Sequence, residues 1–145
     1  MPEIEESIVI ARPREEVYEF MTASDSVQLY NSNVVDYELV SGEERTVGAV
    51  ARGVSKVAGR RLEWTTTIRE IDDGKRTLIA STESKIPFSI EMRFEDDPGG
   101  TKVTWMQHTD ELGGFFGKLA DSLVVKMYAR DVQGNLEKAK LLLES

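Results

Sequence analysis

The sequence predicts an α+β fold in which a curved, seven-stranded antiparallel sheet wraps around one long C-terminal helix, with two short helices after the first strand. Three observations support this prediction. Apolar and polar residues alternate with a period of two over most of residues 34–110. The turns within that region are too short for crossover helices, which makes the sheet antiparallel. An apolar pattern of period 3.6 follows residues 113–114.

The N-terminal segment predicts one strand followed by two short helices. Apolar and polar positions alternate over residues 4–10, which is the pattern of a half-buried strand. Pro13 suits the first turn of a helix over 14–21, because the amide proton that it lacks has no partner there. A second short helix is expected over 27–30, and the polar run at 31–33 ends it.

Six further strands are predicted from the alternation and from the turns between them. The strongest hairpin signal is the run Asp72, Asp73 and Gly74. The strands are expected at residues 34–40, 47–56, 60–71, 77–84, 88–95 and 101–110. Because apolar residues occupy alternate positions, one face of the sheet is expected to be buried and the other solvated.

The C-terminal segment 115–143 predicts one long helix, since it contains no proline and is rich in Leu, Lys, Ala and Glu. A helix of this extent is roughly 40 Å long, so it can cross the whole sheet. Two apolar stripes run along it. The first comprises Phe116, Leu119, Ala120, Leu123 and Met127. The second comprises Val125, Tyr128, Val132, Leu136, Ala139 and Leu143.

Length and composition exclude several kinds of site and partner. The 145 residues carry no repeat or linker, so a single domain over 1–145 is expected. The absence of cysteine excludes disulfides, zinc–cysteine sites and thiol catalysis. A net charge of −8 repels phosphate, so nucleic acid is not an expected partner. The acidic N-terminus and the lack of an apolar run of ~20 residues predict a cytoplasmic protein without stable membrane insertion.

The predicted geometry leaves space between the long helix and the sheet. A twisted sheet of seven strands curls, and a helix about 10 Å wide is narrower than the concave side. Large apolar side chains and a few short polar ones face inward, which is typical of a small-molecule site. A solid core built from the same residues is the competing interpretation. The residues expected to contact a ligand are Tyr30, Arg52, Trp64, Thr66, Phe88, Ile90, Met92, Trp105, Gln107, Phe116, Leu119, Leu123 and Met127.

Four segments, in this order along the chain, resemble a known superfamily. Its first strand and helix start are similar to residues 8–20 (IVIARPREEVYEF), and its central strand to residues 59–64 (GRRLEW). Its last strand resembles residues 100–105 (GTKVTW), and the start of its long helix resembles residues 113–119 (GGFFGKL). Members of this START-like (SRPBCC) superfamily include polyketide cyclases, coenzyme Q-binding proteins and birch-pollen-allergen-like proteins. The segment 27–30 departs from the Pro and Trp that members often carry there.

The resemblance implies the helix-grip fold and a deep pocket between the long helix and the sheet. It also implies that the pocket binds lipids, quinones, polyketides or other apolar small molecules. It does not fix the chemistry, because one fold hosts many functions.

No coherent catalytic group is evident in the sequence. His108 is the only histidine and is expected to point outward, so neither a metal site nor Ser–His catalysis is predicted. Glu63, Arg69 and Glu91 lie opposite the apolar residues of their strands and are expected in water. The face that Arg52 occupies is left open, because apolar residues flank it on its own side. We therefore expect no catalytic residue, no metal and no cofactor.

Three functions remain open at this point. The first is binding or transport of a small hydrophobic ligand in the cavity, without reaction. The second is a polyketide aromatase/cyclase-type enzyme, which needs an ionisable group in the cavity, with Arg52, Tyr30 and Tyr128 as candidates. The third is a protein-interaction module of the same fold. The first is favoured because the inward set is apolar and lacks a catalytic group.

Overall fold

The computed structural model describes residues 3–57, 59–109 and 121–145. It confirms the predicted α+β fold class, the seven-stranded antiparallel sheet and the short helices after the first strand. The elements are β1 (Glu3–Ile10), α1 (Arg14–Thr22), α2 (Val27–Tyr30), β2 (Val34–Ser41), β3 (Val50–Val57), β4 (Arg60–Asp72), β5 (Arg76–Ser84), β6 (Phe88–Asp97), β7 (Gly100–Thr109) and α3 (Asp121–Glu144). The part of the predicted helix before Asp121 lies outside the described residues.

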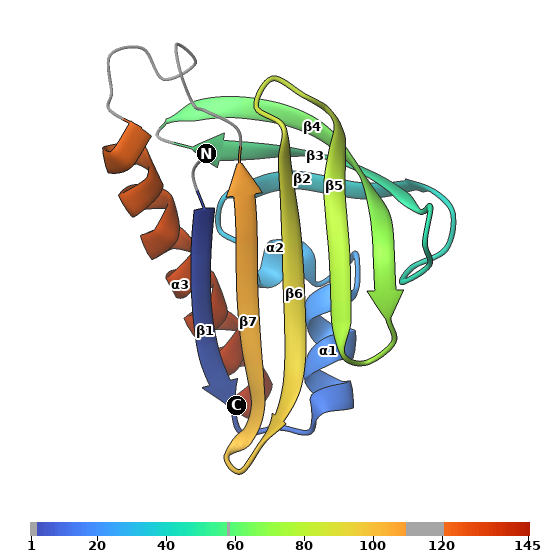
Figure 1. Ribbon diagram of the computed structural model, residues 1–145, viewed down its shortest axis with the longest axis vertical. Coiled ribbons are helices and arrows are strands. Elements are labelled where there is room, and N and C mark those ends of the chain that lie inside the picture. The colour runs from blue at the N-terminus through green and yellow to red at the C-terminus, as the bar shows by residue number, and fades with distance from the viewer. Residues whose placement is uncertain (1–2, 58, 110–120) are drawn as a thin grey trace.

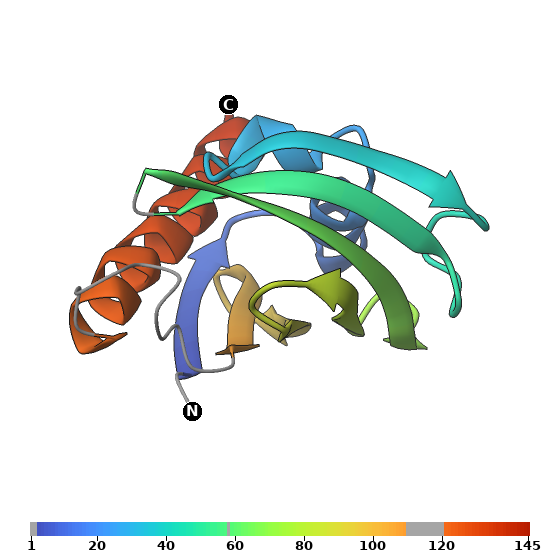
Figure 2. The ribbon, with the colours of Figure 1, turned by 90° about the horizontal axis from the view of Figure 1, so that it is seen from above.

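The sheet has the strand order β1-β7-β6-β5-β4-β3-β2, and every neighbouring pair is antiparallel. Strands adjacent in the chain are therefore adjacent in the sheet from β2 to β7, and β1 pairs with β7. Figure 1 shows α1 and α2 behind the sheet and α3 running alongside β1. Seen from above, the sheet curls strongly, with β2, β3 and β4 on one side of the concave interior and β1, β6 and β7 on the other (Figure 2).

The curl is centred on the long strand β4. Its register against β5 shifts twice, between Thr65 and Thr66 and again between Ile68 and Glu70. Such irregularities bend a strand and increase its twist. They allow β4 to bend while its pairing with β3 stays continuous.

Two clusters of buried apolar side chains form the core. The larger one joins α1 and α3 to β1, β6 and β7, and it includes Ile10, Val17, Met21, Phe94, Val103, Trp105, Val132 and Leu136. The smaller one lies under β3 and β4 and comprises Val34, Val57, Leu62, Trp64 and Ile86. Val125 and Tyr128 of α3 pack against both clusters. The concave interior is thus filled at two places, with α3 bridging them.

Within the described part of α3, only the second predicted apolar stripe contributes fully buried residues. Val132, Leu136 and Ala139 of the second stripe are fully buried, whereas Leu123 and Met127 of the first are 49% and 43% exposed. The helix therefore presents its second stripe to the sheet. No described helix is long and apolar enough to cross a bilayer.

A buried amide network joins α3 to the connection between α2 and β2. Asn135 Oδ1 accepts hydrogen bonds from the backbone N–H of Ser32 at 3.1 Å and from its hydroxyl at 3.2 Å. Asn135 Nδ2 donates to Asn31 Oδ1 at 3.1 Å, and Asn33 Nδ2 donates to Asp131 Oδ2 at 3.0 Å. Buried polar groups are costly unless they are paired, so this network holds α3 at one position relative to α2.

The far end of α3 is held by the connection between β1 and α1. The backbone N–H of Ala11 donates to Glu144 Oε2 at 2.8 Å, and Arg12 Nε donates to the Leu143 carbonyl at 2.8 Å. The hydrogen bond from Ala11 and a second one from Lys140 lower the pKa of Glu144. The helix is therefore held at its middle, through Asp131 and Asn135, and at its C-terminal end.

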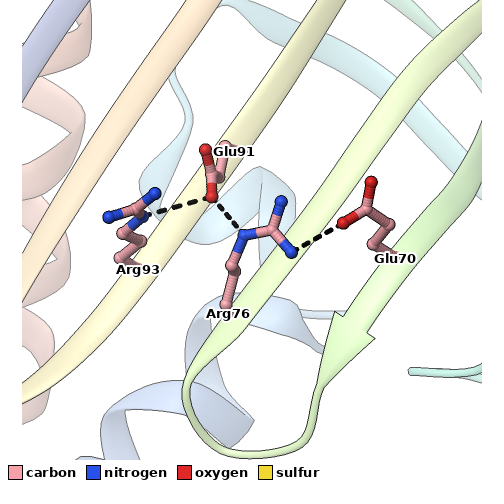
Figure 3. A network of polar contacts seen from close by, with 4 residues as sticks. All are labelled: Glu70, Arg76, Glu91 and Arg93. Carbon is pink, nitrogen blue, oxygen red and sulfur yellow. Dashed lines mark hydrogen bonds and ion pairs between the residues drawn. The ribbon is translucent and has the colours of Figure 1, made fainter.

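The outer face of the sheet carries an ion-pair network between side chains of β4, β5 and β6 (Figure 3). Arg76 of β5 donates from Nη1 to Glu70 Oε1 at 2.8 Å and from Nε to Glu91 Oε2. Arg93 Nε donates to the same Glu91 oxygen at 3.2 Å. Partial burial acts to raise the pKa of Glu91, but the hydrogen bonds from Arg76 and Arg93 outweigh it and lower the pKa. Glu91 thus stays ionised within a cross-strand network on the solvent side.

Candidate functional site

A cavity of about 180 Å³ lies between the two core clusters, in the concave interior of the sheet. Its wall is built from inward-facing side chains of all seven strands and from α1, α2 and α3. The volume is several times the roughly 30 Å³ that one water occupies in the liquid, and it is similar to the ~150 Å³ apolar cavities that hold benzene. The interior is therefore not a solid core.

The lining is mainly apolar, with isolated polar groups. The apolar and aromatic lining residues are Ile4, Met21, Val27, Tyr30, Val34, Tyr37, Leu39, Ala49, Ala51, Val57, Leu62, Trp64, Ile68, Ile71, Ile79, Ile86, Phe88, Ile90, Met92, Trp105, Val125 and Tyr128. The others are Thr22, Asn31, Arg45, Ser55, Thr66, Thr77, Gln107 and Thr109. An apolar wall with a few placed polar groups is the usual composition of a small-molecule site.

Trp64 forms the centre of one wall. Its ring contacts Tyr37 at a centroid distance of 5.9 Å and meets Phe88 edge-on at 6.0 Å. The indole lies directly over Gly53 of β3, where an added Cβ would come within 2.4 Å of the Trp64 ring. Glycine is therefore required at 53 for Trp64 to lie flat along the wall. The indole Nε1 donates to Ser55 Oγ at 2.9 Å.

The opposite wall carries the second tryptophan, Trp105, which is hydrogen-bonded to a polar side chain. Trp105 Nε1 donates to Gln107 Oε1 at 3.2 Å, and Gln107 also hydrogen-bonds the hydroxyl of Tyr128 on α3. On α2, the hydroxyl of Tyr30 donates to the Met21 carbonyl at 2.6 Å. These pairings satisfy the buried indole and phenols and fix their orientations around the cavity.

The phenols around the cavity remain protonated at neutral pH. Burial raises the pKa of Tyr30, Tyr37 and Tyr128 above its ordinary value. For Tyr128 the hydrogen bond from Gln107 opposes this effect without cancelling it. Each phenol is therefore a neutral hydrogen-bonding group, and none supplies negative charge to the cavity.

The structure brings eight of the predicted ligand-contacting residues together around this one cavity. They are Tyr30, Trp64, Thr66, Phe88, Ile90, Met92, Trp105 and Gln107. All except Tyr30 are on strands, where strict alternation determines which side chains face inward. Two further predicted residues, Phe116 and Leu119, lie outside the described part of the chain.

Three predicted positions lie away from the cavity. Arg52 is on the outer face of β3, where its Nη2 donates to Glu38 Oε1 at 2.7 Å in an exposed ion pair. The sequence is misleading here because the inner face of β3 carries Ala51 and Gly53, which leave room for Trp64, while larger apolar side chains flank Arg52 outside. Leu123 and Met127 are on the exposed stripe of α3 and do not line the cavity.

His108 lies on the solvent side of β7, as its position in the alternation predicts. Its Nδ1 is 3.2 Å from Glu3 Oε1 on the neighbouring strand β1, and its side chain is 43% exposed. It is not among the described residues that line the cavity.

Arg45 is a lining residue that the sequence did not reveal. It lies in the connection between β2 and β3 with a backbone φ of 55°, and it is the only charged side chain among the described residues of the lining. The hydrophobic periodicity that indicates the inward-facing residues of strands and helices gives no such indication in an irregular connection. The spacing of Gly42 and Gly48 around it indicates a turn but not the direction of its side chain.

Sequence comparison gives the family. A family profile described as polyketide cyclase / dehydrase and lipid transport matches residues 1–144. The chain belongs to this family. The match confirms the resemblance to the START-like superfamily that the four sequence segments indicate. No curated protein matches the chain in sequence.

Solved structures show the fold of the polyketide cyclase/dehydrase and lipid-transport family. The protein TTHA0849 from Thermus thermophilus is 24% identical with a TM-score of 0.84, over 99% of this chain and 100% of its own. The ZhuI aromatase/cyclase from Streptomyces sp. R1128 is 18% identical with a TM-score of 0.76, over 98% and 93%. Ara h 8.0201 is 16% identical with a TM-score of 0.70, over 99% and 98%. At these identities the similarity establishes the helix-grip fold.

Proposed function

We propose that this member of the family binds a small apolar molecule in the cavity between the curved sheet and α3, as a carrier or binding protein rather than as an enzyme. The observation that supports this most strongly is the cavity itself. It provides about 180 Å³ of mainly apolar space in an interior that the two core clusters otherwise fill. The side chains around an empty space of this size lack packing contacts that they would make if the protein closed it. A bound guest restores those contacts.

The polar groups of the wall support binding of a molecule with one or two oxygen atoms. Thr66 is 3% exposed and Gln107 is 6% exposed, yet both face the cavity. The amide of Gln107 is already paired with Trp105 and Tyr128, whereas the buried hydroxyl of Thr66 needs a partner, and a carbonyl or hydroxyl oxygen of a ligand suits it. Ligands of this class include quinones, polyketides and lipid chains.

Tryptophan fluorescence tests this proposal without a label. The chain has two tryptophans, and both Trp64 and Trp105 line the cavity. A neutral chain with a terminal bromine, ω-bromoundecanol, is expected to quench them saturably because its bromine would lie in contact with an indole. In the variant Trp64→Phe the remaining signal from Trp105 is expected to be quenched as well. Quenching that grows linearly with concentration, as in free solution, would contradict binding in the cavity.

One observation favours the aromatase/cyclase alternative. Of the three candidate ionisable residues, Tyr30 and Tyr128 line the cavity and Arg52 does not. The protonated phenol of Tyr128 could donate to a carbonyl that enolises. The described lining residues, however, include neither a carboxylate nor a histidine that could accept the carbon-bound proton. Binding without reaction is therefore the function that the wall supports best.

A further inference from the structure

The single charged residue of the described cavity lining, Arg45, lies at one end of the interior. Its side chain is 31% exposed, so the guanidinium is partly in water. The charges of Arg45 and of Asp73, in the turn between β4 and β5, both act on the buried hydroxyl of Tyr18 in α1, which places the three groups near one another. This end of the cavity is thus bounded by α1 and by the turns that follow β2 and β4.

The guanidinium of Arg45 is only weakly engaged by the protein. Its nearest described carboxylate oxygen is Glu44 Oε2, at 3.8 Å from Nη1, which is too long for a hydrogen bond. The other oxygen of Glu44 accepts from both the backbone N–H and the hydroxyl of Ser24. Those hydrogen bonds lower the pKa of Glu44. Glu44 is therefore held toward Ser24, and the donors of Arg45 remain available to a ligand.

Arg45 lines the same cavity as Tyr37 and Trp64. Burial raises the pKa of Tyr37, and the nearby charge of Glu44 adds to this, so Tyr37 lies close to the loop that carries Arg45. The centroid of the Tyr37 ring is also 5.9 Å from that of the Trp64 ring. The lining then continues along β4 between Leu62 and Ile71, a span of about 30 Å at the usual rise per residue. A slender chain anchored at Arg45 would therefore pass the tryptophan.

We propose that Arg45 binds the carboxylate of an amphipathic acid whose apolar chain extends into the cavity. This inference rests on the proposed function and specifies its ligand class. The planar guanidinium matches a carboxylate in two parallel hydrogen bonds. A single carboxylate suits the site better than a phosphate ester, because Glu44 and Asp73 would repel the second charge of a phosphate. The net charge of −8 gives no general attraction for anions, so a preference for the acid over an uncharged chain must come from this residue.

A matched pair of probes tests the inference, namely ω-bromoundecanoic acid and the alcohol ω-bromoundecanol at pH 7.5. The acid is expected to quench the tryptophans with an affinity about tenfold higher than the alcohol. In Arg45→Gln this preference is expected to disappear, so that the acid and the alcohol bind with equal affinity. Arg45→Lys keeps the charge and is expected to retain part of the preference. The control Arg52→Gln removes an arginine from the outer face and should leave both affinities unchanged.

The outcomes separate this inference from the proposed function. Equal affinities for acid and alcohol in the wild type, or an undiminished preference for the acid in Arg45→Gln, would overturn the role of Arg45 and leave the cavity as a binding site. Failure of both probes to bind the wild type would overturn the proposed function together with this inference. A partly unfolded variant would bind the acid and the alcohol more weakly by the same factor. The ratio of the two affinities would then stay unchanged, so loss of stability alone cannot produce the expected result.

Discussion

Replacing Ala51 by phenylalanine is expected to weaken the binding of ω-bromoundecanol by at least about tenfold. Ala51 lies on the inner face of β3, paired with Thr66 of β4, and its methyl group borders the cavity. A phenyl ring at this position would occupy the space that the ligand needs. A tenfold loss of affinity corresponds to about 1.4 kcal/mol of binding free energy. Burying one large apolar side chain contributes more than this, so displacing part of an apolar ligand can account for the loss. The measurement is the tryptophan quenching titration.

A second substitution of the same size provides the control. Ala80 of β5 follows Ile79, which faces the cavity, so the Ala80 side chain is on the outer face. Ala80→Phe is expected to bind the probe as the wild type does. Ala51→Leu, a smaller intrusion, is expected to show an intermediate loss if Ala51→Phe strains the fold. Equal affinities in the Ala51 and Ala80 variants would mean that the ligand binds elsewhere.

Replacing Phe94 by alanine is expected to destabilise the protein by about 3–5 kcal/mol, the usual cost of removing a fully buried phenylalanine. Phe94 of β6 is 1% exposed and meets the Tyr18 ring edge-on at a centroid distance of 5.3 Å. It packs where α1 meets the sheet, away from the cavity. Truncation there leaves a void that close-packed neighbours cannot fill. Urea unfolding monitored by circular dichroism measures the change.

Phe88, on the same strand and the same face, is the matched comparison. Phe88 borders the cavity and is only partly buried, so its ring already lacks neighbours on one side. Phe88→Ala is therefore expected to lose clearly less free energy of unfolding than Phe94→Ala. Similar losses at the two positions would indicate that the interior is packed with the same density at both, and that no cavity separates the two core clusters.

The period-two pattern was sufficient to predict site residues on β4, β6 and β7, but the lining residues of β1, β2, β3 and β5 were not predicted. Phe88, Ile90 and Met92 alternate with polar residues along β6, and side chains two apart on a strand necessarily share a face. The same logic correctly placed Trp64 and Thr66 on the inner face of β4. These residues could be predicted because their environment is set by strand geometry alone.

The helix and the irregular connections were less predictable for physical reasons. The sequence of α3 carries two apolar stripes, and either could have been the buried one. Which stripe faces the sheet depends on the hydrogen bonds of Asn135 and Glu144, which fix the helix across the interior. On β3 the apolar pattern pointed the wrong way, because Gly53 makes room for Trp64. The side-chain direction of Arg45 follows from a turn with a positive φ, for which the sequence carries no periodic signal.

The most direct test of the central claim is a crystal structure determined under xenon pressure. Xenon enters apolar cavities without any requirement for a particular ligand, and its electron density is unambiguous. We expect a xenon atom in the interior, in contact with the lining near Trp64 and Trp105. A crystal in which that space holds no xenon, with the side chains of the sheet and α3 in van der Waals contact across it, would contradict the existence of a binding cavity.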